Sequence, residues 1–249
     1  MMKNINLKIS SGNTSLKDFK WKHFSYEIII WALRWYCQFS LSYRDLVLMM
    51  EERSLSISHT TIMRWIHEYA PKLEKRVKRH LRMTNDSWRI DETYIKIKGK
   101  WVYLYRAVDS EGNTLDWMLS ATRNQKAAMI FFKRLSSLSH AVKQPRVIGT
   151  DKNPSYPPDF EVCKEMNVFI ERVALRQIKY LNNIIEQDHR FVKKRAKSSL
   201  WFQSFDTAKV TIAGYETMHM IRKGQLKIAG NNNPQSQIKF IEKLFGIAA

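Results

Sequence analysis

The sequence predicts an α/β domain, built on a mixed sheet with flanking helices and preceded by an all-α region. Two observations support this division. Up to about residue 83, apolar side chains recur at helical spacing between polar caps. From residue 88 onward, runs of aromatic and β-branched residues alternate with short turns and then with helical segments. We therefore expect helices first and a sheet afterwards.

The composition predicts a polyanionic partner. The 249 residues are 44% hydrophobic and 12% aromatic, which is enough for a core in one large domain or in a small and a medium one. Lys and Arg outnumber Asp and Glu by 42 to 23, which gives a net charge of +19. Nucleic acid is the commonest partner of so basic a chain.

A membrane surface is the alternative partner, and the sequence argues against it. The longest apolar run, residues 28–33, is far too short to cross a bilayer and stops at Arg34. The N-terminus has no apolar core after its lysines, so we expect no signal peptide. Cys37 and Cys163 are far apart and predict neither a disulfide framework nor a zinc site. We expect a cytoplasmic, nucleoid-associated protein without a membrane partner.

The N-terminal third predicts a flexible arm and then helices. Residues 1–19 are polar and are assigned to the arm, and residues 20–83 to the helical region. Dense apolar residues within 23–40 predict a buried first helix. Ser42 and Asp45 have the spacing of a capping box and open a second helix.

A third helix is expected over residues 61–70. Ser58 or Thr60 is its expected cap, and Pro71 is expected to end or kink it. Three such helices with a short connection resemble a helix-turn-helix, whose third helix enters the major groove by its N-terminal end. The expected DNA contacts are Ser58, His59, Thr60, Thr61 and Arg64. An ordinary three-helix bundle is the alternative, but six cations between residues 72 and 82 favour DNA binding.

The region from residue 84 to 224 predicts the α/β domain, and residues 225–249 a polar C-terminal tail. Strand-like runs at 88–97, 101–108 and 113–120 are joined by tight turns and predict an antiparallel meander. The later elements are expected at 123–137 (helix), 146–150 (strand), up to 166 (short helix), 168–172 (strand), from Asn182 (helix) and 205–222 (helix). This order of strands and helices matches a ribonuclease-H-like fold.

The helix that begins at Asn182 carries a charged stripe. Glu186, Arg190, Lys193 and Lys197 follow one another at i, i+4, i+7 and i+11, so they share one face. One carboxylate followed by a row of cations suits a metal ion at one end and a phosphate backbone along the rest. The alternative is a solvated face with a Glu–Arg pair at i, i+4.

Asp91, Asp151 and Glu186 are the candidate catalytic and metal-binding acids. Asp91 lies in the first strand, and Asp151 lies where a buried strand ends, a usual place for functional residues in an α/β sheet. In the predicted topology the three carboxylates converge at one end of the sheet. Clustered carboxylates repel one another, and divalent cations relieve the repulsion. Oxygen ligands favour Mg²⁺ (or Mn²⁺), and two ions about 4 Å apart suit phosphoryl transfer.

Several nearby residues are interpreted as lying outside this site. Glu92 follows Asp91, but the period of two in a strand turns it to the opposite face. Asp188 lies about 200° around the helix from Glu186. His189 is interpreted as a structural residue or a phosphate contact. No nucleophile–histidine arrangement or phosphate-binding glycine loop competes with the three acids.

Ordered motifs in this chain resemble the transposases of the insertion-sequence-six family. The resemblance extends from about Phe19 to Gln225 and is carried by the segments 30–37, 42–45, 69–71, 73–76, 88–96, 103–109, 150–152 and 176–190. The arm before Phe19 is longer than in typical members, and the segment after Gly224 matches poorly.

The resemblance implies a bacterial DDE transposase with Asp91, Asp151 and Glu186 as its acidic triad. Lys193 falls at the basic position that follows the glutamate in the family. The family also implies binding to the terminal inverted repeats through the helix-turn-helix, 3′-end cleavage, and strand transfer to target DNA. Transposition would be replicative, and the double-stranded DNA ends would be paired by a homo-oligomer.

The same features leave two alternative functions open. A structure-specific nuclease on the same fold would hydrolyse DNA without strand transfer. A catalytically inactive repressor would use only the helix-turn-helix, although the presence of all three acids argues against it.

Overall fold

The structure is a computed structural model that describes residues 17–151, 156–177, 183–227 and 233–247. Its centre is a five-stranded mixed sheet in the order β3-β2-β1-β4-β5. The bounds are β1 (Ser87–Ile97), β2 (Lys100–Asp109), β3 (Thr114–Ser120), β4 (Val147–Thr150) and β5 (Ala174–Gln177). The first three strands are antiparallel, and β4 and β5 run parallel to β1. The predicted ribonuclease-H-like order of elements is confirmed.

The last strand was predicted in the wrong place. The apolar residues around Phe169 suggested a strand at 168–172, but β5 begins at Ala174 and pairs with β4 in the register Val147↔Ala174. Phe169 is buried and contacts the rings of Trp88 and Phe160. The run is apolar because it closes the core beneath the sheet, and it does so without pairing to a strand.

Two helical layers cover the two faces of the sheet. On one face lie α4 (Gln125–Ser136) and α5 (Tyr156–Glu165), and on the other lie α6 (Asn183–Ser198) and α7 (Phe205–Arg222). Successive side chains of β1 point to opposite faces of the sheet, so they are divided between the two helical layers. Trp88 and Ile90 pack with α4 and α5, whereas Ile95 and Ile97 pack in the other core.

The N-terminal helices are α1 (Tyr26–Gln38), α2 (Tyr43–Glu51) and α3 (His59–Val77). The predicted capping box is present, since Ser42 Oγ accepts from Asp45 N at 3.1 Å and Asp45 Oδ2 accepts from Ser42 N at 2.7 Å. Of the two expected caps of α3, Ser58 is the one used, and its Oγ accepts from Thr61 N at 3.2 Å.

Pro71 does not end the third helix, contrary to one of the predicted outcomes. The helix α3 continues for nearly two turns beyond it, to Val77. Proline removes one backbone donor and crowds the preceding turn. Leu73 and Val77 are fully buried in the core that α3 shares with α7. This apolar burial outweighs the loss of one hydrogen bond.

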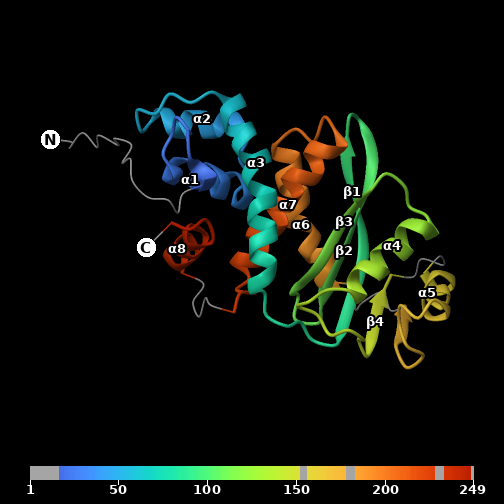
Figure 1. Cartoon of the computed structure of the whole chain (residues 1–249). Coiled ribbons are helices and arrows are strands. Elements are labelled where there is room, and N and C mark those ends of the chain that lie inside the picture. The colour runs from blue at the N-terminus through green and yellow to red at the C-terminus, as the bar shows by residue number, and fades with distance from the viewer. Residues whose placement is uncertain (1–16, 152–155, 178–182, 228–232, 248–249) are drawn as a thin grey trace.

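One hydrophobic core joins the N-terminal helices to the sheet. In Figure 1, α7 lies between α3 and the sheet, and its side chains pack on both sides. The helix α6 is also tied to α1, because the buried Arg195 guanidinium donates to the carbonyl of Cys37 at 3.0 Å. The change in sequence character near residue 84 is therefore not a boundary in packing. The division into 20–83 and 84–224 stays a prediction about domains.

Both ends of the described chain pack on α3. Lys17–Phe19 form a short 3-10 turn, and Phe19 is buried with its ring stacked on Tyr69 at 5.0 Å. These three residues therefore do not belong to a flexible arm, and residues 1–16 lie outside the described residues. The predicted polar tail contains α8 (Pro234–Leu244), whose Phe240 and Ile241 are buried. Among the described helices, none is long and apolar enough for a bilayer span.

Gly214 marks a close approach of α7 to α1 and α3. A Cβ there would meet Cys37 Sγ at 2.5 Å and Ala70 Cβ at 3.0 Å. We expect Gly214→Ala to lower the free energy of unfolding by about 1–2 kcal/mol, because overpacking costs more than the helix propensity of Ala returns. Urea unfolding measures this.

The double variant Gly214→Ala/Cys37→Ala is the matched control for this effect. It removes the sulfur that the new methyl group would meet, so the two changes should cost less together than the sum of the separate costs. A Gly214→Ala protein as stable as the parent would contradict the close approach.

Candidate active site

The parallel pairing of β1 with β4 brings Asp91 and Asp151 together. Trp88 pairs with Ile148 and Arg89 with Gly149, so the same register continued by two residues places Asp91 beside Asp151. One carboxylate oxygen from each of Asp91, Glu92 and Asp151 lies within 4.8 Å of the others. All three side chains are half-buried. The sequence predicted the two aspartates here and missed the glutamate.

Glu92 enters the group from the other face of the strand. As predicted, it points away from the face of Asp91, toward Arg123, whose Nη2 lies 3.4 Å from Glu92 Oε2. Asp151 directly follows the end of β4, and one of its carboxylate oxygens lies within 4.8 Å of a Glu92 oxygen. Burial raises the pKa of Glu92, and the charge of Arg123 opposes this shift. Arg123 Nη2 is also 3.8 Å from Asp151 Oδ2, so one cation faces two of the acids.

Glu186 lies outside this group of acids. It lies in the first turn of α6, exposed, and it is not a member of the group within 4.8 Å. The structure therefore brings together two of the three predicted acids. The predicted cap of the helix, Asn182, lies outside the described residues.

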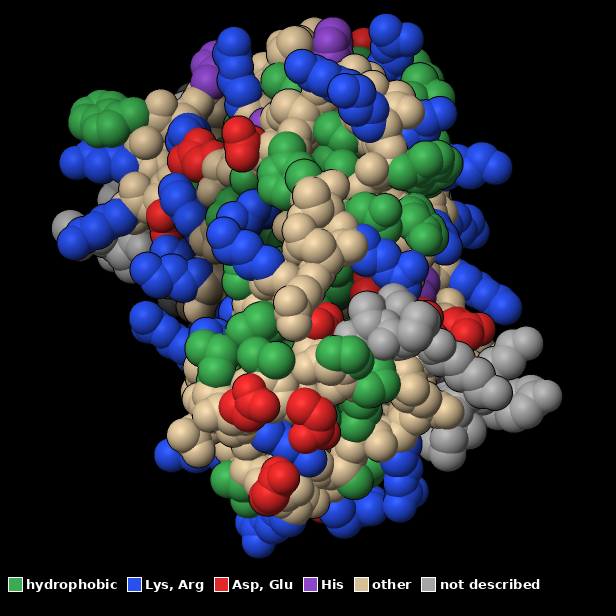
Figure 2. Space-filling model, turned by 90° about the vertical axis from the view of Figure 1, so that its right-hand side faces the viewer, with side chains coloured by type: hydrophobic (Ala, Val, Ile, Leu, Met, Phe, Trp, Pro, Cys, Tyr) green, Lys and Arg blue, Asp and Glu red, His purple; other side chains and the backbone are tan. Residues whose placement is uncertain are grey.

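The charged stripe on α6 faces solvent. Glu186, Arg190, Lys193 and Lys197 are all exposed, whereas Ile185, His189 and Val192 are buried. Among the ion pairs of the described residues, none joins Glu186 to Arg190. The cations are therefore available to a partner from solution. Figure 2 shows Lys and Arg spread over the face it presents, with Asp and Glu in a few small groups.

A buried polar network lies directly behind Asp91. His189 Nε2 is 3.1 Å from Asp91 Oδ2, and His189 Nδ1 is 3.4 Å from an Nη1 of Arg106. Arg106 is fully buried and donates to Glu216 at 2.7 and 2.9 Å and to Asp188 at 2.7 Å. His189 is thus buried, with a partner at each ring nitrogen. Asp188, which was interpreted as lying outside the site, belongs to this polar network behind Asp91.

The network shifts the pKa values of its members. Burial lowers the pKa of His189, with the charge of Arg106 acting in the same direction and the hydrogen bond to Asp91 opposing it. Burial alone would raise the pKa of Asp188, but Arg106, His219 and Lys223 outweigh it and hold that pKa well below its usual range. Arg106 and Glu216 are 110 residues apart in sequence, and no local pattern in the sequence pairs them.

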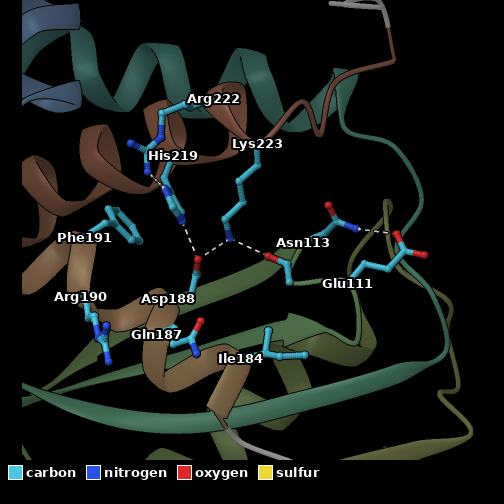
Figure 3. A pocket seen from close by; sticks show the side chains of 11 residues that line it. Glu111, Asn113, Ile184, Gln187, Asp188, Arg190, Phe191, His219, Arg222 and Lys223 are labelled. Carbon is cyan, nitrogen blue, oxygen red and sulfur yellow. Dashed lines mark hydrogen bonds and ion pairs between the residues drawn. The ribbon is translucent and has the colours of Figure 1, made fainter. Parts of the chain in front are cut away.

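A cavity of about 520 Å³ opens on the other side of this network, between the β2–β3 turn, α6 and the end of α7. Figure 3 shows Asp188 at its wall, bonded by His219 at 2.6 Å and by Lys223 at 2.7 Å. Arg190 and Arg222 also line it and are exposed. The cavity therefore continues the basic surface of α6.

We expect His219 to make the stability of the fold depend on pH. Burial lowers its pKa from 6.5 to about 3, although Asp188 acts in the opposite direction. As pH falls below 6.5, the unfolded chain binds a proton at His219 that the folded protein does not, so the free energy of unfolding falls. By about pH 4 the loss from this residue should be on the order of 3 kcal/mol.

The His219→Gln variant tests this expectation, because Gln keeps a donor for Asp188 and does not titrate. Chemical unfolding at several pH values should show a shallower loss of stability for His219→Gln than for the parent between pH 6.5 and 4. Parallel pH profiles would show that His219 is not held neutral.

The N-terminal end of α3 is open to solvent. Ser58, His59, Thr60 and Arg64 are exposed, and Thr61 is half-buried. Much of the basic run after Pro71 is used within the protein: Lys72 and Arg76 pair with Asp18. The exposed start of α3 suits a groove contact, and the individual DNA contacts stay predictions.

Comparison with known proteins places this chain in a family. Residues 85–225 match a family model described as a DDE domain. The chain is 41% identical over 209 residues to the transposase for insertion sequence-like element IS431mec of Staphylococcus aureus. This match covers 82% of this chain and 88% of the relative. The transposase for insertion sequence element IS257 in transposon Tn4003, also from Staphylococcus aureus, matches with the same identity and coverage. Among solved structures, the HTLV-2 integrase catalytic core domain in complex with magnesium (trimeric form) gives a TM-score of 0.41 at 18% identity, over 61% of this chain and 92% of that chain.

A mixed sheet of this topology with a DDE domain defines a polynucleotidyl transferase. The chain belongs to the DDE transposases of the insertion-sequence-six family, and its activity is the transposition of an insertion sequence. The family uses divalent metal ions. The acids fit such a group, because three carboxylate oxygens converge at one half-buried point and hard oxygen donors are what divalent ions such as Mg²⁺ prefer.

Proposed function

We propose that this transposase binds the terminal inverted repeats of its element and carries out 3′-end cleavage and strand transfer into target DNA by a replicative route. Asp91, Asp151 and Glu186 would be the acidic triad, with Mg²⁺ (or Mn²⁺) as the metal, in two ions. The observation that supports this most is the convergence of Asp91 and Asp151 at the end of β4, in a chain that matches a DDE domain over this region.

The carboxylates would hold the metal between sheet and helix. Asp91 is fixed on β1 and Asp151 at the end of β4, so both are positioned by the sheet. Glu186 would join from the first turn of α6. Held by these carboxylates, divalent ions would supply activation of the attacking oxygen and charge stabilisation of the leaving oxygen in an in-line phosphoryl displacement. Arg123 would shift from the acids toward a DNA phosphate, because its positive charge competes for the same carboxylates.

The DNA would follow two basic surfaces. Arg190, Lys193 and Lys197 form an exposed row along α6 next to Glu186, with Lys193 nearest the scissile phosphate. The exposed start of α3 would read the inverted repeat through Ser58, His59, Thr60, Thr61 and Arg64. Double-stranded ends and target would be brought together by a homo-oligomer in the cytoplasm, at the nucleoid.

The test is incubation of the purified protein with a labelled duplex carrying the element's own ends and a target plasmid, with and without Mg²⁺. Metal-dependent joined product is expected. Cutting without joining would replace the proposal by the nuclease, and binding without either reaction would replace it by the repressor.

Arg64→Ala should weaken binding to the ends. If Arg64 contacts a base, the binding free energy should fall by about 1–3 kcal/mol and sequence preference should weaken. If it contacts a phosphate, the slope of log affinity against log salt concentration should fall by about 1. Fluorescence anisotropy at several salt concentrations measures both. The control is Arg172→Ala, an exposed arginine before β5. Equal affinity of Arg64→Ala and Arg172→Ala would move the recognition surface away from α3.

A further inference from the structure

We propose that His189 is a positioning residue for Asp91, and that Arg106 fixes the tautomer in which His189 acts. The inference rests on the proposed function in one respect, since it takes Asp91 to be a metal-binding acid. It goes further by assigning the buried network behind that acid a role in the reaction.

The tautomer follows from hydrogen-bond chemistry. A guanidinium group has donors and no acceptor, so the ring nitrogen that faces Arg106 must accept. That nitrogen is His189 Nδ1, 3.4 Å from Arg106 Nη1. The ring hydrogen is then on Nε2, 3.1 Å from Asp91 Oδ2, and it is donated to that carboxylate. His189 therefore holds one oxygen of Asp91 and limits rotation of the carboxylate.

Arg106 is itself held from two helices. Its guanidinium makes two bonds to Glu216 on α7 and one to Asp188 on α6, and no part of it is exposed. The ring of Phe191 lies against it, 5.0 Å from the guanidinium carbon. The orientation of Asp91 on the sheet is therefore coupled to the placement of α6, the helix that carries Glu186.

A second histidine shows the same arrangement without the acid cluster. Arg222 Nη2 lies 3.3 Å from His219 Nδ1, and His219 Nε2 lies 2.6 Å from Asp188. This arrangement ends at Asp188, whereas the one through His189 ends at an acid of the converging group. A third buried histidine, His140, has its ring Nε2 bonded to the carbonyl of Leu115 at 2.9 Å and serves as the control.

Two variants separate positioning from packing. His189→Gln keeps a side-chain N–H near the Nε2 position, and His189→Leu removes it at similar volume. In the absence of DNA, Mn²⁺ affinity measured by electron paramagnetic resonance should fall about 10–100-fold in His189→Leu, as is usual when a partner of a metal ligand is lost. His189→Gln should recover most of the affinity, and His140→Leu should keep the parent value.

The tautomer is measured without any substitution. In the metal-free protein, ¹⁵N-detected NMR of the imidazole should show the hydrogen on Nε2 of His189. A hydrogen on Nδ1, or unchanged Mn²⁺ affinity in His189→Leu, would overturn the inference. An Asp91→Asn variant distinguishes failure of the proposed acidic triad from failure of the positioning role of His189. If it keeps full Mn²⁺ affinity and strand transfer, the proposed triad fails, whereas if it loses both while His189→Leu keeps both, only the positioning role fails.

Discussion

Asp151→Asn is expected to abolish end cleavage and strand transfer, with a loss of roughly a thousandfold or more, about 4 kcal/mol in activation free energy. Asn keeps the size of the side chain and removes the charge. Asp151 supplies one of the three converging oxygens, and the remaining acids then hold a divalent ion less well. Labelled-end cleavage and plasmid joining measure both steps.

Binding to the ends should survive this change, because the proposed contacts lie at the start of α3 and along α6. Asp86→Asn is the matched control: Asp86 is an exposed carboxylate just before β1, paired with Arg146. It should leave cleavage and joining unchanged. Joining that persists in Asp151→Asn would refute the proposed mechanism.

The same assay decides between the two glutamates near the site. Glu186 matches the glutamate of the family's acidic triad, but it is exposed and lies outside the converging group, whereas Glu92 lies within that group. If Glu186 is the third acid, Glu186→Gln should match Asp151→Asn and Glu92→Gln should retain most activity. The reverse result would assign the third position to Glu92.

The largest effect on stability is expected from Arg106→Met. Removing this cation leaves Glu216, which is fully buried, without its partner, and deprives Asp188 of one donor. Breaking a buried ion pair by removing one member usually costs about 3–5 kcal/mol. Urea unfolding should show a loss of that size.

The double variant Arg106→Met/Glu216→Met provides the control. It replaces both charges by apolar side chains of similar length, so it should be more stable than Arg106→Met alone. A loss below about 1 kcal/mol in Arg106→Met would show that the pair contributes little, and the stability of α6 and α7 against the sheet would need another explanation.

The elements that were predicted correctly are those that local sequence encodes. Alternation in 88–97 and the turns that follow specify the meander, and the capping box at Ser42 specifies the start of α2. The predictions that failed were decided by burial. Pro71 lies inside a helix because of the residues beyond it that pack on α7, and Phe169 is apolar because it fills the core.

The sequence alone therefore determined the order of the elements and the basic character of the surface. It also identified Asp91 and Asp151 as candidate metal-binding acids, at strand positions that lie side by side. Tertiary structure decided the rest. It added Glu92 to the converging acids, left Glu186 outside the group within 4.8 Å, and joined Arg106, Asp188 and Glu216 into one network. The physical reason is range: hydrogen-bond caps and strand alternation act between neighbours in the chain, whereas a buried charge is satisfied by any partner that the packed helices bring to it.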